Sequence, residues 1–268
     1  NGNCLSPTSG NAPQIFASAL QYFAAAQCLI TEDWPPDANV KSEEIFDFII
    51  IGGGTAGCIL ANRLSEVEHW KVLLIHEGGD PPVESIIPQL EKNVVGSSFT
   101  WNYKTKYDGK IGLAHTNGTI DIAIGNILGG GSSVNGMVYV RGDDHTYEEW
   151  YKQGNKDWHP DLIKEAFKKA ERLEDSRLLK YPSVKSYYGL HGYLHLNYFN
   201  TTDIADNEIV SSWHQMGFKN VIDISSSNGL GSGLFIGTIS KGRRESAAKA
   251  YLTGRVGRRP NLKVMKFT

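Results

Sequence analysis

Residues 46–57, Phe-Asp-Phe-Ile-Ile-Ile-Gly-Gly-Gly-Thr-Ala-Gly, constrain the fold more than any other stretch of the chain. The first six residues are an apolar, β-branched run, which predicts a short strand buried on both faces. Gly52, Gly54 and Gly57 follow at G-x-G-x-x-G spacing, and apolar residues recur behind them at helical intervals. Because another apolar run follows at 71–75, the stretch predicts a βαβ unit of the dinucleotide-binding type.

The three glycines of this motif have separate physical roles. Gly52 lets the chain turn sharply out of the strand, Gly54 lets the backbone approach a pyrophosphate, and Gly57 lets the helix pack closely on the strand. The free N–H groups of the helix's first turn, together with the helix dipole, attract phosphate charge. The pattern therefore predicts a dinucleotide site rather than a plain turn between strand and helix.

The second predicted strand ends at His76-Glu77-Gly78-Gly79. A dinucleotide site normally carries an acid at this point, where it accepts hydrogen bonds from a ribose hydroxyl. Glu77 follows the last glycine of the motif at close to the usual separation of about 20 residues. The alternative interpretation is that Glu77 is a solvated side chain at a turn.

A second glycine-rich stretch, 125–142, reads Gly-Asn-Ile-Leu-Gly-Gly-Gly-Ser-Ser-Val-Asn-Gly-Met-Val-Tyr-Val-Arg-Gly. The backbone of such a loop is able to wrap around a flat or phosphorylated ligand. Its apolar residues, Ile127, Leu128, Val134 and Met137, favour burial, which argues against a flexible linker.

Strands and helices are predicted along the rest of the chain. The strands cover 101–105, 119–124, 191–199, 234–239 and 261–267, and the helices cover 143–153, 159–173 and 245–252. Asp203 is expected to cap one more helix, which carries Trp213 and Met216 on one face. In helix 159–173, Asp157 is the expected cap, and an apolar stripe that includes Leu162 is expected to be core.

Composition excludes several classes of function. The chain has 268 residues, and its 27 Lys and Arg against 29 Asp and Glu give a net charge of −2. Nothing in this balance indicates nucleic acid or an anionic membrane surface as a partner. The uncharged, Ala-rich stretch 15–30 is too short and too polar to span a bilayer, and it is interpreted as a short helix packed on the domain.

Three cysteines are too few for a disulfide scaffold or a zinc site. Cys58 lies on the predicted first helix and is interpreted as a small buried residue. Cys4 and Cys28 flank an N-terminal segment and would bridge in an oxidising compartment. Since the sequons at Asn117 and Asn200 are compatible with secretion, we expect an extracellular protein.

Metal and nucleophile motifs give no competing prediction. His191 and His195 are four residues apart, as metal ligands on a helix are. The alternation from Tyr193 to Leu196 predicts a strand instead, so no metal site is expected. The sequence also carries no G-x-S-x-G elbow, no P-loop and no Cys/His nucleophile pair.

With both glycine stretches taken together, the chain resembles the glucose–methanol–choline (GMC) oxidoreductases, and among them the insect glucose-dehydrogenase-like members. The resemblance is carried by 47–57, by Ala-Asn-Arg-Leu-Ser-Glu at 61–66 and by the signature 125–142. Weaker matches lie at 101–103 and 242–252. Together these segments cover nearly the whole chain from Phe46 onward.

The resemblance implies non-covalently bound FAD and oxidation of the CH–OH group of an alcohol, with hydride passing to flavin N5. It assigns to the cofactor Gly52, Gly54, Thr55, Ala56 and Gly57 at the pyrophosphate, Gly129, Gly130, Asn135, Gly136, Met137 and Val138 along the pyrophosphate and flavin, and Trp101 as a further contact.

Aligned with the family pattern, the acid after the second strand falls on His76, and Glu77 takes the place of an alanine. Successive side chains of a strand point to opposite faces. Three outcomes are therefore open: the strand end turns enough for Glu77 to reach the ribose, His76 donates to the ribose instead, or FAD binding is weakened.

The fold class implied is α/β: a discontinuous, Rossmann-like FAD-binding fold with part of an α+β substrate domain. We expect an N-terminal segment and linker at 1–45 and the first part of the FAD-binding domain at 46–180. The substrate-binding region is expected to start within 181–240, and 241–268 to return, incomplete, to the FAD-binding domain. The family's catalytic pair, His with His or Asn, lies beyond Thr268, so no residue of this chain is assigned as catalytic and a chain truncated at its C-terminus is expected.

Two other interpretations remain open at this point. One is a non-catalytic FAD-binding or protein-interaction remnant, suggested by His76 and by the missing half. The other is an NAD-dependent dehydrogenase, which the loop 125–142 disfavours. For the FAD enzyme, the donor is a small alcohol (sugar, polyol, choline-like compound or sterol), and the electron acceptor is oxygen or a quinone.

Overall fold

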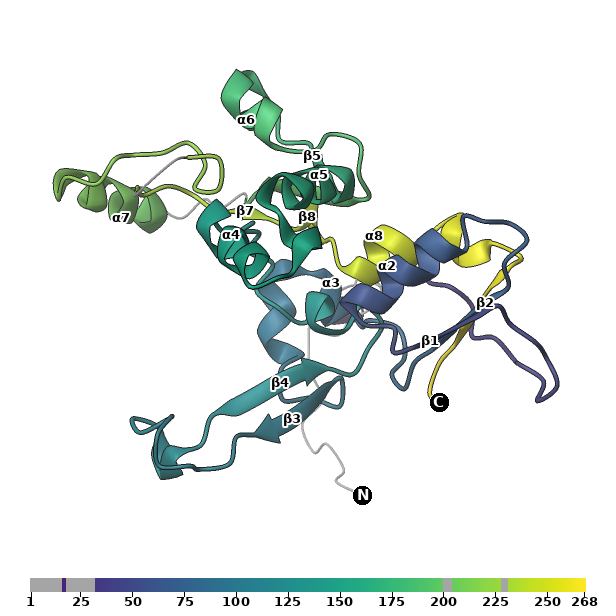
Figure 1. The fold of residues 1–268 in the computed structure, drawn as a ribbon. Coiled ribbons are helices and arrows are strands. Elements are labelled where there is room, and N and C mark those ends of the chain that lie inside the picture. The colour runs from purple at the N-terminus through teal and green to yellow at the C-terminus, as the bar shows by residue number, and fades with distance from the viewer. Residues whose placement is uncertain (1–15, 18–31, 200–203, 228–230) are drawn as a thin grey trace. The chain divides into compact units, whose positions relative to one another are not determined.

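The computed structural model describes residues 16–17, 32–199, 204–227 and 231–268, and residues 34–268 form one compact unit. The first sheet of this unit has three parallel strands in the order β1-β2-β10. These are β1 (Phe48–Ile51), β2 (Val72–Ile75) and β10 (Leu262–Met265). The predicted βαβ unit is thus confirmed, and a strand from the far end of the described sequence joins it (Figure 1).

Two helices cover one face of this sheet. They are α2 (Thr55–Leu64) and α8 (Ala247–Leu252), which pack on each other (Figure 1). The first core lies between these helices and the sheet and contains Ile50, Cys58, Ala61, Val72, Leu74, Leu128, Ala248, Tyr251, Leu252 and Val264. Cys58 is fully buried there, as expected, and burial raises the pKa of its thiol to about 12.

The expectation that both faces of 46–51 are buried is wrong. Phe48 and Ile50 face the helices, whereas the side chains of Ile49 and Ile51 are 56% and 78% exposed. Since β1 is an edge strand and the helices cover one face of its sheet, alternate side chains point away from the core. An apolar run does not by itself distinguish a strand that is buried on both faces from an edge strand whose sheet is covered on one face.

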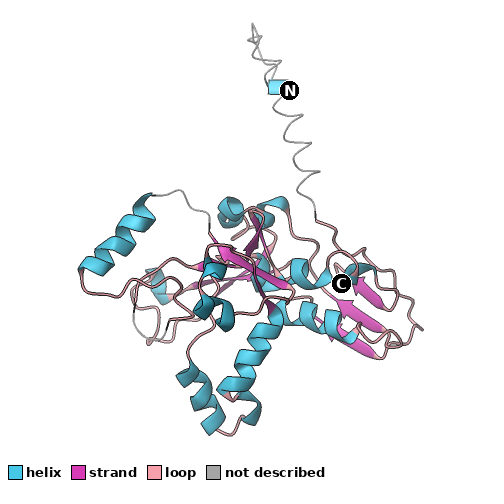
Figure 2. Cartoon of the chain, turned by 90° about the horizontal axis from the view of Figure 1, so that it is seen from above, coloured by secondary structure: helices cyan, strands magenta, loops and turns pink. Residues whose placement is uncertain are grey.

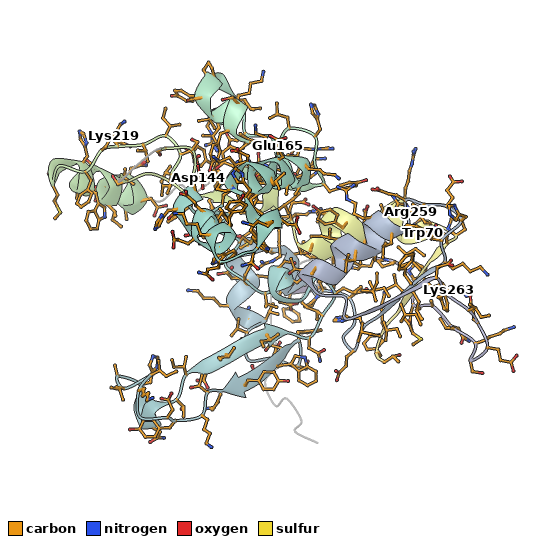
Figure 3. All side chains as sticks on the ribbon, in the orientation of Figure 1. Trp70, Asp144, Glu165, Lys219, Arg259 and Lys263 are labelled. Atoms are coloured by element: carbon orange, nitrogen blue, oxygen red, sulfur yellow. The ribbon has the colours of Figure 1, made fainter. Side chains whose placement is uncertain are left out.

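Side-chain hydrogen bonds connect the turn between α2 and β2 to the residues just before β10. Asn261 donates its side-chain N–H groups to the carbonyls of Ser65, Val67 and Trp70 at 2.9–3.1 Å. Arg259 donates to the hydroxyl of Ser65 at 2.8 Å. Figure 3 shows Arg259 and Trp70 at the same end of the α2–α8 layer. These bonds satisfy the carbonyls of a turn that has no partner strand of its own.

A second core forms around the sheet β5-β6-β7, made of β5 (Glu171–Leu173), β6 (Leu194–Tyr198) and β7 (Ile236–Gly237). The helices in this part of the sequence are α4 (Asp144–Lys152), α5 (Pro160–Ala170) and α6 (Pro182–Tyr187). The buried residues are Leu173, Leu178, Val184, Tyr188, Leu196 and Ile236. This core therefore combines residues from both sides of position 180, and the domain division stays a prediction.

The remaining helices and strands lie outside the two three-stranded sheets; Figure 2 shows all helices in cyan and all strands in magenta. They are α3 (Val83–Ile86), the antiparallel ribbon β3 (Thr100–Lys104) and β4 (Asp121–Gly125), α7 (Ile204–Gln215), and the short pair β8 (Ile239–Ser240) and β9 (Arg243–Arg244). The predicted strand 234–239 is divided between β7 and β8, and beside the break the N–H of Thr238 donates to the Met137 carbonyl, next to the antiparallel bridge between Val138 and Gly237.

Three expectations about the helix 159–173 need correction. It ends at Ala170, because Glu171 begins β5 and its carboxylate is buried against Arg141. The cap is His159, whose Nδ1 accepts from the N–H of Asp161 at 3.3 Å, and not Asp157. The apolar stripe is not core, since α5 has no fully buried residue and Leu162 is 55% exposed.

Several predictions fall on residues that the structure does not describe. Cys4, Cys28, Asn200 and Asp203 lie outside the described ranges, as does most of the stretch 15–30. Among the helices that are described, none is both long and apolar enough to cross a membrane. His195 lies on β6, as predicted, and no group of three or more potential metal ligands occurs within the described ranges.

Candidate cofactor-binding site

The two glycine-rich segments meet in the folded chain. The N–H of Gly129 donates to the carbonyl of Gly53 at 2.8 Å, and the hydroxyl of Thr55 donates to the carbonyl of Gly129 at 3.2 Å. A Cβ added at Gly130 would lie 2.9 Å from the Cα of Gly54. Segments more than 70 positions apart are therefore in backbone contact, and we call the surface they form the cradle: residues 52–56 and 131–138.

Glycines in the cradle and directly after it divide into those that pack against other backbone and those that leave space. A Cβ at Gly57 would lie 1.9 Å from the carbonyl oxygen of Gly52, so α2 approaches the strand more closely than a side chain would permit. A Cβ at Gly54 or Gly136 would meet no atom within 4 Å. The second group leaves open backbone on the surface, where a ligand has room to lie.

The predicted cofactor residues separate in the same way. Gly52, Thr55, Ala56, Asn135, Gly136 and Val138 are exposed, Gly54 is half-buried, and Gly57, Gly129, Gly130 and Met137 are buried. Gly129 and Gly130 are thus buried at the point where the two segments contact each other. The exposed group forms the surface that is available to a cofactor, and its contacts with FAD stay a prediction.

The N-terminus of α2 opens onto this surface. Its cap, Gly54, provides no side-chain hydrogen bond, and the first turn carries no acidic residue. The orphan N–H groups of the turn and the positive end of the helix dipole therefore favour an anionic group there.

At the end of β2, His76 and Glu77 point in different directions. His76 is 8% exposed, and its Nδ1 accepts from the N–H of Gly53 at 3.2 Å. Glu77 is exposed. Trp101 is half-buried on β3, opposite Ile124, with its ring stacked on Tyr103 at 6.2 Å. Of these three predicted residues, His76 thus has a hydrogen bond to the backbone of the cradle.

Arg244 is a residue of this site that the sequence analysis did not single out. Its side chain is 2% exposed, and it donates to the carbonyls of Ser85, Ser132 and Asn135 at 2.7, 3.2 and 2.8 Å and to the Asn135 side chain at 2.8 Å. Burial lowers the pKa of Arg244 to about 10, with Glu91 acting in the opposite direction. The sequence feature that could have pointed to this residue is the adjacent pair Arg243-Arg244 before a helix. The sequence does not tell which of the two arginines is buried.

The cradle continues directly into the second core. Met137 has a φ of 60°, its N–H is held by the side chain of Asn135, and its carbonyl accepts from the N–H of Thr238 at 2.8 Å. The N–H of Tyr139 then donates to the Ile236 carbonyl at 2.9 Å. The exposed part of the loop is therefore fixed at its C-terminal end by sheet-like contacts.

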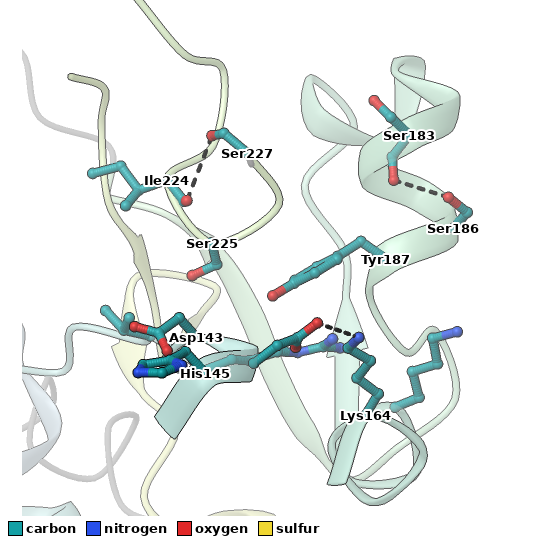
Figure 4. A pocket seen from close by; sticks show the side chains of 14 residues that line it. Asp143, His145, Lys164, Ser183, Ser186, Tyr187, Ile224, Ser225 and Ser227 are labelled. Atoms are coloured by element: carbon teal, nitrogen blue, oxygen red, sulfur yellow. Dashed lines mark hydrogen bonds and ion pairs between the residues drawn. The ribbon is translucent and has the colours of Figure 1, made fainter. Parts of the chain in front are cut away.

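A separate polar groove of about 1010 Å³ lies between α4, α5, α6 and residues 224–227 (Figure 4). Two of its charged side chains pair with each other: Lys164 donates to Asp144 at 2.6 Å. Figure 3 labels Asp144 on α4 and Glu165 on α5, two helices that lie side by side. None of the predicted cofactor residues lines this groove, so it is distinct from the cradle.

The residues present fit FAD at the cradle on three observations. The open backbone at Gly54 and Gly136 leaves room, the helix N-terminus is uncapped, and the buried Nε2 of His76 has no hydrogen-bond partner among the described residues.

Comparisons with known proteins support this geometry. The chain is 37% identical over 244 residues to ecdysone oxidase from Bombyx mori, covering 91% of this chain and 36% of that protein. It is 34% identical over 250 residues to glucose dehydrogenase [FAD, quinone] from Drosophila melanogaster, covering 92% and 39%. Pyridoxine 4-oxidase from Mesorbium loti superposes with a TM-score of 0.74 at 27% identity, over 83% of this chain and 42% of that one. The chain spans less than half the length of the relatives it matches.

The family comparison decides the classification. The sequence profile described as GMC oxidoreductase matches residues 46–268, which include both glycine-rich segments and the whole cradle. The structural likeness to pyridoxine 4-oxidase independently supports the predicted fold class. Because the match extends over most of its length, this chain belongs to the GMC oxidoreductase family.

Proposed function

We propose that this chain is the cofactor-binding part of an FAD-dependent oxidoreductase that acts on the CH–OH group of an alcohol donor. The observation that carries the proposal is the cradle, in which two distant glycine segments present open backbone at an uncapped helix N-terminus. A dinucleotide's pyrophosphate is the ligand that such a surface favours.

The chain's own residues would bind and orient the cofactor. Thr55 and Ala56, in the first turn of α2, would hold the pyrophosphate with their N–H groups. Asn135, Gly136 and Val138 would lie along the remainder of the cofactor. The chemistry that FAD supplies when bound is acceptance of a hydride from the alcohol carbon.

The donor proposed is a sterol or sugar alcohol. The relatives at 37% and 34% identity carry the names ecdysone oxidase and glucose dehydrogenase, and both cover more than 90% of this chain. Oxygen and a quinone are the two acceptors that follow from the same names. We further propose an extracellular location, for which the sequon at the exposed Asn117 is the support within the described residues.

The proposal is tested on the full gene product, purified and reconstituted with FAD. We expect a yellow protein with flavin absorbance, which bleaches under anaerobic conditions on addition of an alcohol from the sterol or sugar class. Retained flavin that no alcohol bleaches would favour the non-catalytic remnant. Tight binding of NAD without any flavin binding would favour a nicotinamide enzyme and overturn the proposal.

A further inference from the structure

The loop that joins β3 to β4, residues 105–120, contains a tight turn, and we call this loop the ribbon tip. Asn117 and Gly118 have φ values of 60° and 63°, as in the turns that Asn-Gly pairs favour. The N–H of Gly118 donates to the His115 carbonyl at 2.9 Å. In Figure 1 the ribbon tip is the free end of the β3–β4 ribbon. The turn is therefore fixed by its own backbone.

The side chain of Asn117 is exposed, and among the described residues none forms a hydrogen bond with it. Asn135 precedes a glycine in the same way, but its amide oxygen accepts from the N–H of Met137 and from Arg244. Only the first of these two asparagines begins an Asn-x-Thr sequon, the acceptor for N-linked glycosylation. A group attached to Nδ2 of Asn117 would thus replace no contact of the folded chain.

Large apolar side chains surround this turn. A Cβ added at Gly118 would lie 2.2 Å from the ring of Tyr107, so the ring packs on the turn itself. A Cβ added at Gly112 would lie 2.9 Å from the Gly118 carbonyl oxygen, which places the neighbouring Ile111 and Leu113 beside the same turn. Tyr107, Ile111 and Leu113 are 57%, 60% and 67% exposed. Apolar side chains that are exposed together indicate a surface that another group covers.

We propose that the amide of Asn117 carries an N-linked oligosaccharide whose first sugars cover the apolar side chains of the ribbon tip. The inference rests on the proposed extracellular location, because this modification is made in the secretory pathway. Sugar rings have apolar C–H faces that pack on aromatic rings, and their hydroxyl groups stay in water. An oligosaccharide therefore suits a surface on which the ring of Tyr107 lies next to open solvent.

The modification is a transfer of an oligosaccharide from a polyprenyl diphosphate, catalysed by an oligosaccharyltransferase before the chain folds. Nδ2 of Asn117 forms a bond to the anomeric carbon of the first sugar. The bond between that carbon and the diphosphate oxygen breaks, one amide proton is released, and no atom is oxidised or reduced. Thr119 supplies the hydroxyl that the sequon requires. The folded ribbon tip has only to accommodate the product, which the exposure of Asn117 permits.

Three variants of the full gene product alter the sequon while they keep the turn. Thr119→Ser retains the hydroxyl and should retain the glycan. Thr119→Val has a similar shape but lacks the hydroxyl, so the glycan should be lost although Asn117 remains. Asn117→Asp removes the acceptor amide and keeps a residue that tolerates positive φ. Asn39→Asp changes an exposed asparagine outside any sequon and is the matched control.

The site is tested on protein produced in insect cells, collected from the medium and digested for mass spectrometry after enzymatic glycan removal in ¹⁸O-water. This treatment leaves a labelled aspartate in place of each glycosylated asparagine. We expect the label at position 117 in the wild type, Asn39→Asp and Thr119→Ser, and no label there in Thr119→Val. A secreted wild type without the label would overturn this inference alone. A product that stays in the cytosol would overturn the extracellular location as well, whereas bleaching of the flavin by an alcohol tests the oxidoreductase assignment separately.

The covering role has a second readout, the binding of an apolar fluorescent dye to the folded protein. Enzymatic removal of the glycan should increase dye binding, and Asn117→Asp, which has the charge of the treated protein, should match it. In the double variant Ile111→Ser/Leu113→Ser the same treatment should cause a smaller increase. An equal increase in both proteins would overturn the covering role.

Discussion

Two buried arginines, Arg141 at the end of the second glycine-rich stretch and Arg244 bonded to it, are 4% and 2% exposed, and their charges are stabilised in different ways. Arg141, in the second core, forms a bidentate pair with the fully buried Glu171, with Nε donating to Oε1 at 2.6 Å. The hydroxyl of Tyr139 and the N–H of Gly189 also donate to that carboxylate. Burial opposes the charge of Arg141, but the hydrogen bonds and attraction from Glu171 outweigh it and raise its pKa.

Arg244, beneath the cradle, is bound mainly by oxygens without formal charge. Three backbone carbonyls and the Asn135 side chain accept its hydrogen bonds, and Glu91 stands 3.8 Å away. The contrast indicates that the second core is satisfied within the chain, whereas the cradle uses a buried charge to fix the shape of a loop. Stability should therefore depend most on the first arginine, and cofactor affinity most on the second.

The largest expected effect is in the second core. Glu171→Gln leaves Arg141 buried without a counter-charge, so we expect the free energy of unfolding to fall by ~3–5 kcal/mol in urea denaturation. Lys164→Gln, which breaks the exposed pair with Asp144, is the control and is expected to cost less than ~1 kcal/mol. A similar loss in both variants would mean that the buried pair contributes no more than a surface one.

A smaller loss of stability is expected when the cradle's arginine is removed. Arg244→Met leaves buried carbonyls without a donor, and we expect a loss of ~2–3 kcal/mol together with weaker FAD binding. Arg255→Met, an exposed arginine, is the matched control. Urea denaturation and FAD titration are measured on both variants, and an Arg244→Met protein with unchanged FAD affinity would remove the proposed contrast.

Gly54, within the cradle, and Gly57, directly after it, allow effects on stability and on cofactor binding to be separated. Gly57→Ala places a Cβ 1.9 Å from the Gly52 carbonyl and is expected to destabilise the fold by ~1–3 kcal/mol. Gly54→Ala meets no protein atom and is expected to leave unfolding unchanged while weakening FAD binding. Thermal unfolding without cofactor and FAD titration measure the two effects. Unchanged FAD affinity in Gly54→Ala would contradict the assignment of that open space to the cofactor.

The smallest effect concerns pH and the second core. Burial raises the pKa of Asp175, but hydrogen bonds from Arg177 and Tyr198 outweigh it and lower the pKa below its usual value. Its contribution to stability is thus present above the unfolded pKa of about 3.9 and is lost as pH falls through the folded pKa. Asp175→Asn should flatten the fall in stability below pH 4, measured by urea denaturation at pH 3–6. An equally steep fall in the variant would assign the acid sensitivity to other groups.

Local patterns were sufficient for part of the molecule. The spacing of Gly52, Gly54 and Gly57 between two apolar runs is a short-range requirement of a strand–turn–helix unit, and it correctly predicted β1, α2 and β2. The alternation at 191–199 likewise predicted β6. These features depend on neighbours within about 20 residues, which is why sequence reasoning was able to find them.

Tertiary structure decided the rest, because the physical partners are far apart in sequence. The end of α5 depends on Glu171 meeting Arg141, the exposure of Ile49 depends on which face of the sheet the helices cover, and the role of Arg244 depends on carbonyls more than 100 positions away. The sequence by itself determined that the chain is a GMC-type α/β protein with two glycine segments suited to a dinucleotide. Only the fold decided that His76 is buried with its Nδ1 bonded to Gly53 while Glu77 is exposed, since the direction of a strand's last side chains is set by what packs against them.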